Sequence, residues 1–206
     1  GTVWIGTAQG GVARLAAGGI RPLPEPDGAT VGRIVSFVED ADGILWVNAG
    51  GRSFTVEDGA VPAAGRPSVE GARYMVLEDG AGARWYSLPD RMARAFEGDV
   101  RIFEVPDGAV MVEDPRSGYW IGTGNDGLFY FRPDETGSDA VRRYALPDGQ
   151  LAFRVRSMHV DRAGNVWVGT NANGLLRAKR NLFTTYTAEH GLSHDVATAV
   201  YEDAAG

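Results

Sequence analysis

Short apolar runs alternate with clusters of glycine, asparagine and aspartate along the whole chain. Residues 34–38 and 74–77 are typical runs, rich in β-branched and aromatic side chains. Such residues fit the pleated, half-buried surface of a sheet, so each run predicts a short strand. The glycine and asparagine clusters between the runs tolerate positive φ angles, and they predict tight reversals of the chain.

An aspartate follows several of these runs and begins a tight connection that ends in glycine. The connections are residues 40–43, 79–82 and 161–164, and a longer copy covers residues 114–118. An Asp side chain accepts backbone N–H groups within such a turn, and Gly takes its left-handed position. The pattern therefore predicts a turn between two consecutive strands.

Tryptophan marks the strand after each turn. The five tryptophans are Trp4, Trp46, Trp85, Trp120 and Trp167. The copies at Trp4, Trp120 and Trp167 continue with Ile or Val, Gly and Thr, whereas the other two have drifted. A recurrence of about 40 residues along a chain indicates a repeat architecture.

Each repeat predicts four strands. An apolar strand A leads into the aspartate turn, the tryptophan strand B follows, and a Gly/Asn turn leads into strands C and D. Four strands in about 40 residues are typical of a β-propeller blade. The sequence therefore predicts an all-β fold: a single β-propeller domain of five four-stranded antiparallel blades over residues 1–206. Blade two should end near Val61, and blades three, four and five should cover residues 72–105, 110–146 and 153–186.

The two ends of the chain are complementary in this pattern. The chain opens on the strand B of Trp4, and residues 195–206 predict a strand A with its turn and no strand B. Docking of that last strand beside Trp4 would complete blade one and cover two exposed sheet edges. We therefore predict that the C-terminal strand joins the N-terminal blade and closes the ring. The alternative is an arc of a larger propeller.

The repeat resembles the two-component regulator propeller repeat. The resemblance rests on Asp-x-x-Gly-x-x-Trp-Ile-Gly-Thr, the Gly-Leu that follows, a Phe-x-x-Tyr strand, and the link between blades at residues 186–195. That family builds the periplasmic sensor region of hybrid histidine kinases and related bacterial receptors. The resemblance implies a module that binds an extracytoplasmic cue, with a carbohydrate as the suggested ligand. It also implies that the signalling domain and the membrane-spanning segment lie outside this chain.

Composition excludes some partners without naming a ligand. The chain of 206 residues has a formal net charge of −7, which argues against nucleic acid, because its binders usually carry a basic face. The absence of cysteine excludes disulfides and thiol chemistry. No apolar stretch is long enough to span a bilayer, so we expect membrane attachment only through segments outside this chain.

The B–C turns and the links between blades share one face of a propeller, and such folds usually bind ligands there. The candidate ligand-binding residues on this face are Arg33, Asn48, Arg52, Asn125, Asp126, Arg154, Asn171 and Asn173. Their amide, carboxylate and guanidinium groups suit ligands that bear hydroxyl or carboxylate groups. The alternative for each single Asn or Asp is a role in turn geometry alone.

Arg33 and Arg154 share one position in the repeat. Each lies seven residues before the aspartate of its turn. That position is the start of strand A, where the channel of a propeller opens on the predicted binding face. We expect both side chains to point into one ring; the alternative is a solvated surface arginine.

The three histidines allow two other chemistries. His159 or His190 would be the base of a lyase-like enzyme, because histidine titrates near neutral pH unaided. His190 and His194 are four residues apart on a predicted loop with no third ligand, so we predict neither a metal site nor a cofactor.

Through the resemblance to the two-component regulator propeller repeat, we expect a non-catalytic, ligand-binding sensor module of a bacterial membrane signalling receptor, in a periplasmic or other extracytoplasmic location. Its predicted partners are a small-molecule or oligosaccharide ligand and the rest of the receptor chain. A lyase-like propeller enzyme and a protein-interaction scaffold are the alternatives.

Overall fold

The computed structural model describes residues 3–16, 18–24, 31–56, 69–106, 108, 110–114, 118–136, 140–146, 149–179 and 182–200. Over these residues it holds 18 strands in five antiparallel sheets, and one 3-10 turn, η3 (Ala188–His190). Each sheet corresponds to one predicted blade, which confirms the all-β propeller fold and its five blades. No helix among these residues is long and apolar enough to cross a bilayer.

The contacts divide the chain into two compact units. Blades one to three form most of the first unit, and blades four and five form most of the second. The prediction of a single domain over residues 1–206 stays a prediction.

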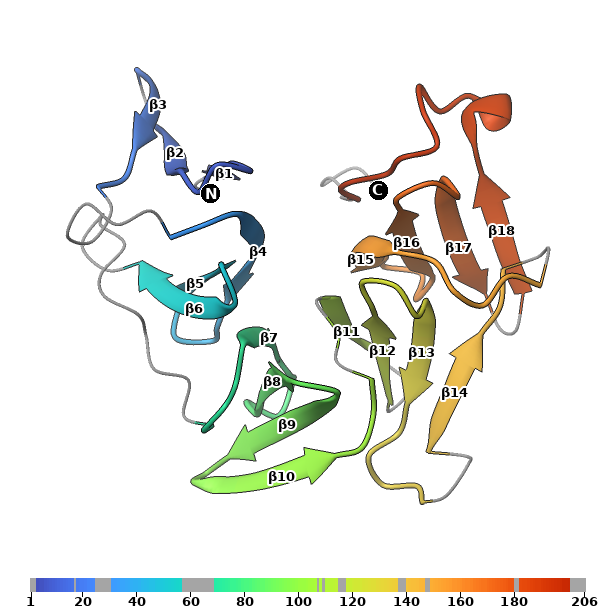
Figure 1. Ribbon diagram of the computed structural model, residues 1–206, viewed down its shortest axis with the longest axis horizontal. Helices are drawn as coiled ribbons and strands as arrows, with labels where there is room; N and C mark the ends of the chain where they lie inside the picture. The colour runs from blue at the N-terminus through green and yellow to red at the C-terminus, as the bar shows by residue number, and fades with distance from the viewer. Residues whose placement is uncertain are drawn as a thin grey trace. The chain divides into compact units, whose positions relative to one another are not determined.

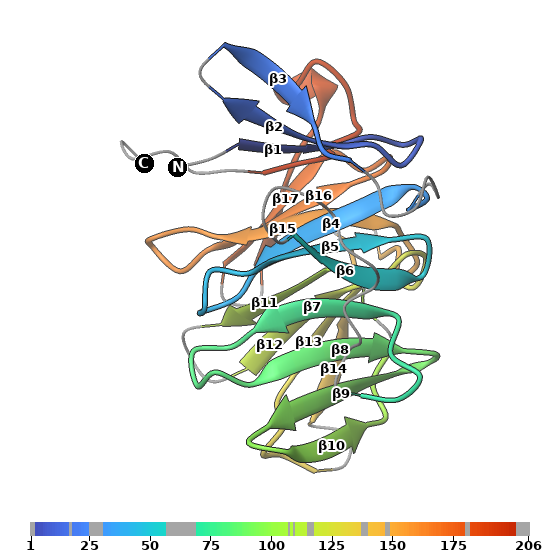
Figure 2. The ribbon, with the colours of Figure 1, turned by 90° about the vertical axis from the view of Figure 1, so that its left-hand side faces the viewer.

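The first unit contains three sheets. Blade one has strands β1 (Val3–Gly6), β2 (Val12–Ala16) and β3 (Gly19–Pro22). Blade two has β4 (Ile34–Glu39), β5 (Leu45–Ala49) and β6 (Arg52–Val56). Blade three has β7 (Tyr74–Glu78), β8 (Arg84–Leu88), β9 (Arg91–Phe96) and β10 (Asp99–Phe103). The strands of each sheet lie side by side in chain order (Figure 1, Figure 2). The fourth strand predicted for blade two, up to Val61, falls outside the described residues.

The second unit contains two four-stranded sheets. Blade four has β11 (Val110–Asp114), β12 (Gly118–Gly122), β13 (Leu128–Phe131) and β14 (Val141–Tyr144). Blade five has β15 (Val155–Val160), β16 (Val166–Thr170), β17 (Leu175–Lys179) and β18 (Leu182–Tyr186). Both sheets keep the predicted A-B-C-D order.

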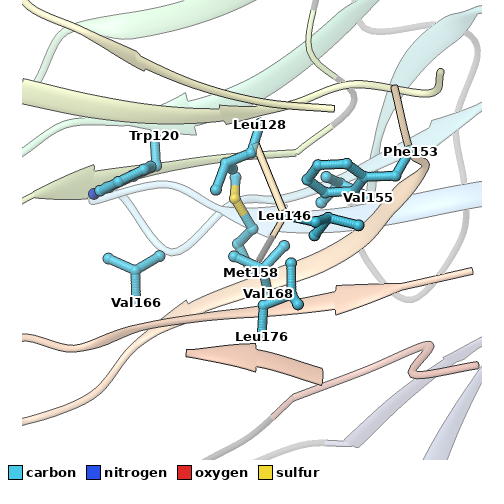
Figure 3. Close-up of a cluster of buried hydrophobic side chains, with 9 residues drawn as sticks. All are labelled: Trp120, Leu128, Leu146, Phe153, Val155, Met158, Val166, Val168 and Leu176. Atoms are coloured by element: carbon cyan, nitrogen blue, oxygen red, sulfur yellow. The ribbon is translucent and has the colours of Figure 1, made fainter. Parts of the chain in front are cut away.

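Neighbouring blades within a unit share a hydrophobic core. Between blades four and five this core consists of Trp120, Leu128, Leu146, Phe153, Val155, Met158, Val166, Val168 and Leu176 (Figure 3). Figure 3 shows the side chain of Met158, on β15, directed toward Leu128 of β13. Trp46, Trp85 and Trp120 are buried core residues, whereas Trp4 and Trp167 are partly buried.

The aspartate of each turn joins the turn to the tryptophan strand. In blade two, the Asp40 carboxylate accepts the Ile44 N–H at 2.9 Å and the Trp46 indole N–H at 2.9 Å. The same aspartate–indole bond is 3.0 Å in blade three, 3.1 Å in blade four and 2.8 Å in blade five. Gly43 has a φ angle of +78°, so the predicted left-handed glycine is confirmed. The spacing between Asp and Trp is constant in the repeat because one carboxylate accepts both the backbone N–H at the end of the turn and the indole N–H.

The Gly-Thr pair after the tryptophan receives the first strand of the next blade. In the second unit the Val155 N–H donates to the Thr123 carbonyl at 3.0 Å. A Cβ atom on Gly122 would lie 2.5 Å from the Val155 side chain, so only glycine allows this approach. Blade one receives blade two in the same way, through Ile34 and Thr7 at 3.2 Å.

The C-terminal segment meets blade five in this same manner. Ala197 donates its N–H to the Thr170 carbonyl at 2.9 Å, and Gly174 donates to the Asp195 carbonyl at 2.8 Å. Residues 195–197 therefore occupy the place of an incoming strand A. The described part of this segment forms no strand, and the sheet of blade one contains three described strands. Residues 201–206 lie outside the described residues, so ring closure by the C-terminal strand stays a prediction.

Candidate functional site

The B–C turns of blades four and five are built by a threonine and a glycine. The Thr123 N–H and hydroxyl both donate to the Gly127 carbonyl at 3.0 Å, and the Asp126 N–H donates to the Thr123 hydroxyl at 2.8 Å. Thr170 makes the corresponding three bonds in blade five at 2.7–3.1 Å. The threonine thus fixes each turn from within and leaves the residues between at the surface.

Positive φ angles in these two turns belong to glycine. Gly127 has a φ angle of +90° and Gly174 of +68°. Among the described residues other than glycine, positive φ angles occur at Asp90 and Glu97, which belong to blade three. The asparagines of the two turns are therefore not required for a left-handed backbone. Their amides are available for contacts with other groups.

Arg154 lies at the centre of the candidate site. Its Nε donates to the Gly124 carbonyl at 2.8 Å, and its Nη2 donates to the Asn125 amide oxygen at 3.0 Å. The three residues are exposed, and the Arg154 carbonyl accepts the Asn171 N–H at 3.1 Å. The structure therefore brings together three residues that the sequence predicts for the site: Arg154, Asn125 and Asn171.

Arg143 holds the other end of the same turn. Its Nε donates to the Asp126 carbonyl at 2.9 Å, and its guanidinium lies 5.5 Å from the centre of the Phe129 ring. Arg143 comes from β14, whose pairing with β13 places it opposite Phe129. Arg143 was not predicted as a site residue, because its contact depends on the register of strand D rather than on a local motif.

The turn of blade five carries further polar contacts. The amide oxygen of Asn171 accepts two bonds from the Arg156 guanidinium, one of them 3.0 Å from Nε. The Asn173 amide donates to the Gln150 amide oxygen at 3.3 Å. Amide and guanidinium groups are thus found at both B–C turns of the second unit.

Arg143 and Arg154 differ from other arginines of the chain in their partners. Arg84 lies 3.0–3.1 Å from the carboxylates of Glu78 and Asp40, and Arg94 lies 3.1 Å from that of Asp79. Arg143 and Arg154 instead contact neutral oxygens, and neither forms an ion pair with any of the described residues. Their positive charge is not neutralised by a neighbouring carboxylate of the described structure.

The remaining predicted residues belong to the first unit. Arg33 is exposed and directly precedes Ile34, so it holds the place in blade two that Arg154 holds in blade five. Arg52 is exposed at the start of β6. Asn48 is fully buried: its amide donates to Ser36 and to the Met75 carbonyl, and its amide oxygen accepts the Ser53 hydroxyl. The side chain of Asn48 supports packing between blades two and three and does not reach the surface.

The histidines lie on two different elements. His159 is partly buried on β15, opposite Trp167 in the register of the sheet. His190 is exposed in η3, and its Nδ1 lies 2.9 Å from the Thr187 hydroxyl. His194 is exposed, and its Nδ1 accepts the Val196 N–H at 3.2 Å.

Comparison with known proteins confirms the resemblance of the repeat. Residues 154–172 match the family model of the two component regulator propeller. The matched segment includes Arg154, the aspartate turn, β16 and Asn171. A comparison with curated protein sequences finds no match.

Solved structures share the fold over nearly the whole chain. The extracellular domain assigned to the hybrid two component system BT3049 of B. thetaiotaomicron aligns with a TM-score of 0.68 and 15% identity, over 98% of this chain and 29% of that one. The extracellular domain assigned to the one component system BT4673 of the same organism aligns with a TM-score of 0.61 and 15% identity, over 99% and 36%. Virginiamycin B lyase from Staphylococcus aureus aligns with a TM-score of 0.64 and 15% identity, over 90% and 66%.

These similarities show the fold. The chain spans about a third of the length of the two receptor domains and about two thirds of the lyase.

Proposed function

We propose that this chain is a ligand-binding sensor module of a bacterial membrane signalling receptor and that it works outside the cytoplasm. Two findings support the class: the match of residues 154–172 to the two component regulator propeller, and the shared fold with extracellular receptor domains. The ligand binds without being converted. Its binding shifts the balance between arrangements of the receptor that differ in affinity for it.

The observation that carries the proposal is the cluster formed by Arg154, Asn125 and the Gly124 carbonyl. These exposed groups are held in place by hydrogen bonds of 2.8–3.0 Å, so a ligand would meet donors that are already oriented. Ordering a side chain costs free energy on binding, and a pre-organised side chain reduces that cost. A small molecule or an oligosaccharide with several oxygen atoms is the ligand class that such groups recognise.

A thermal-shift screen tests this proposal, because a ligand that binds only the folded protein raises its apparent stability. The panel contains neutral oligosaccharides, acidic oligosaccharides, small carboxylic acids and divalent metal ions. We expect at least one sugar or acid to raise the unfolding temperature, and Asn125→Ala to reduce that shift without changing the stability of the free protein. A panel in which no compound shifts the transition, or shifts that Asn125→Ala leaves intact, would contradict the proposal at this site.

A lyase-like enzyme is the second candidate, because virginiamycin B lyase has the same fold. The base would be His159 or His190. Turnover of a substrate that is lost in His159→Ala or His190→Ala would favour this enzyme over the sensor. Ligand binding without turnover, unchanged in both variants, would favour the sensor.

A further inference from the structure

We infer that the turn at residues 124–126, together with Arg143 and Arg154, which are bonded to it, binds an oxyanion group of the ligand, so that the cue is an acidic saccharide rather than a neutral one. This inference rests on the proposed function. The group recognised is a carboxylate, as in a uronic acid, or a sulfate ester. Both present oxygen atoms with a negative charge to the same donors.

Both arginines keep N–H donors outside their described contacts. A guanidinium has five N–H donors in a planar fork. The described contacts of Arg154 occupy one donor on Nε and one on Nη2, and those of Arg143 occupy one donor on Nε. The Nη1–Nη2 end of each guanidinium therefore keeps donors for the two parallel bonds that a carboxylate or sulfate accepts.

The charge of Arg143 and Arg154 also favours an anion. The chain has 27 acidic residues against 20 Lys and Arg, so carboxylates are plentiful as partners for its arginines. Arg84, Arg94 and Arg132 all have one, at 2.6–3.1 Å. Arg143 and Arg154 are oriented by backbone and amide oxygens, which fix their position without cancelling their charge. Two such exposed guanidiniums on one turn favour an anion at that place.

Both arginines bind carbonyls of the same exposed turn, Arg154 that of Gly124 and Arg143 that of Asp126. The Asn125 side chain belongs to the same turn and its amide oxygen accepts a bond from Arg154, which leaves its amide nitrogen to donate to a ligand hydroxyl. The one carboxylate of the turn, that of Asp126, disfavours a bare anion. It favours a ligand that also offers hydroxyl donors, as a sugar does.

The test compares matched pairs of probes by titration calorimetry on the whole chain. One pair is a galacturonate trisaccharide and its carboxyl-reduced neutral counterpart; the other is a sulfated disaccharide and its desulfated counterpart. We expect at least one acidic member to bind tenfold or more tightly than its neutral counterpart, and its affinity to fall as salt is raised, because exposed charges are screened. The pair that shows this difference identifies the anionic group.

The variants are Arg143→Ala and Arg154→Ala, with Arg142→Ala as the matched control. Arg142 is an exposed neighbour on β14, and successive side chains of a strand point to opposite faces. Arg154→Ala should lower the affinity for the acidic probe roughly tenfold to a hundredfold, the size of one charged hydrogen bond. Arg143→Ala should lower it in the same direction, and Arg142→Ala should leave it within about twofold. Arg154→Lys keeps the charge but not the planar fork, so it should recover only part of the affinity.

Equal binding of acidic and neutral probes, or an equal loss in Arg142→Ala, would overturn the inference while leaving the proposed sensor in place. Binding of a neutral sugar that Asn125→Ala weakens and Arg154→Ala does not would also overturn the inference and leave the proposed sensor in place. Failure of every probe to bind would count against the proposed function itself and the inference with it.

Discussion

A single aspartate in each of blades two, three and five holds a turn, a strand and an indole together. In blade three the Asp79 carboxylate accepts the Ala81 and Ala83 N–H groups, the Trp85 indole N–H and the Arg94 Nε. The carboxylate is completely buried. At the scale of single residues, loss of this aspartate would deprive four donors of their shared acceptor.

Replacing Asp79 by alanine should destabilise the fold by about 3–5 kcal/mol, because the buried Trp85 indole and the Arg94 guanidinium lose their shared partner. Chemical denaturation with a tryptophan fluorescence readout measures this loss. Asp42→Ala is the control, since that carboxylate is 76% exposed and should contribute within about 0.5 kcal/mol. Equal stability of the two variants would mean that the aspartate does not support the turn.

The contribution of Asp161 to the stability of blade five depends on pH. Burial raises the pKa of Asp161, but hydrogen bonds from Asn165 and Trp167 lower the pKa by more, to below its ordinary value of 3.8. A carboxyl with a lowered pKa in the folded state stabilises the fold above its unfolded pKa, and this contribution is lost as the pH falls through the folded pKa. Asp161 is therefore expected to contribute fully at neutral pH and not at all in strong acid.

Asp161→Asn should lower the unfolding temperature at about pH 7, and the difference from the unsubstituted protein should shrink as the pH falls below about 4. The reason is that protonation removes from the unsubstituted protein the same charged acceptor that the variant already lacks. Thermal unfolding followed by circular dichroism across this pH range provides the measurement. A difference that stays constant or grows toward low pH would contradict this account of the pKa.

At the scale of strands and turns, the close approach of the incoming chain explains several glycines. Gly127 ends the B–C turn of blade four with a φ angle of +90°, and a Cβ atom there would collide with the Leu151 carbonyl oxygen. Gly124 begins the same turn without a positive φ angle, and a Cβ atom there would meet nothing within 4 Å. The same turn thus contains one glycine that cannot accommodate a Cβ atom and one that can.

Gly127→Ala should cost about 2 kcal/mol or more, from the left-handed backbone together with the collision. Gly124→Ala should stay within about 0.5 kcal/mol, because the added methyl group projects into open space. The two midpoints of denaturation in urea give the comparison directly. A larger loss in Gly124→Ala than in Gly127→Ala would show that blade five does not approach blade four as described.

Local sequence was sufficient to predict the blades because each strand and turn is decided by residues close together in the chain. The left-handed Gly43 and the aspartate turns follow from their own residue types, and they were predicted correctly. The aspartate–indole bond was missed, although its constant spacing of six residues was visible in four copies.

Longer-range contacts limited the prediction of the site. Asn48 was expected in a B–C turn, yet it lies in β5 and its buried side chain is bonded to the Met75 carbonyl, 27 residues away. Arg143 joins the turn of blade four from 17 residues away, through strand pairing that no local motif encodes. Arg154 and Asn125 were predicted to lie near each other, because the position of each residue follows from the register of the repeat. The hydrogen bond between them was not predicted, because it depends on the path of the link between the blades.

At the scale of the whole chain, blades one, four and five each rely on a segment that comes later in the sequence. Blade one is contacted by Ile34 and blade four by Val155, each bonded to the threonine that directly follows the tryptophan strand. Blade five is contacted by the C-terminal segment, through Ala197 and Asp195. Asp195 also accepts the Ala188 N–H at 2.7 Å with its carboxylate, which ties η3 to the same segment.

Deletion of residues 195–206 should therefore destabilise blade five, because Thr170, Gly174 and the Ala188 N–H lose their partners together. At roughly 0.5–1.5 kcal/mol for each hydrogen bond, the expected loss is about 2–4 kcal/mol. The exposed backbone groups would also offer a sheet edge for pairing with another molecule, so we expect association at high concentration. Thermal unfolding and size-exclusion chromatography measure the two effects. Deletion of residues 201–206 alone is the control, since it keeps the bonds of Asp195 and Ala197. If the longer deletion stays monomeric and as stable as the control, the C-terminal segment is not the strand on which blade five depends.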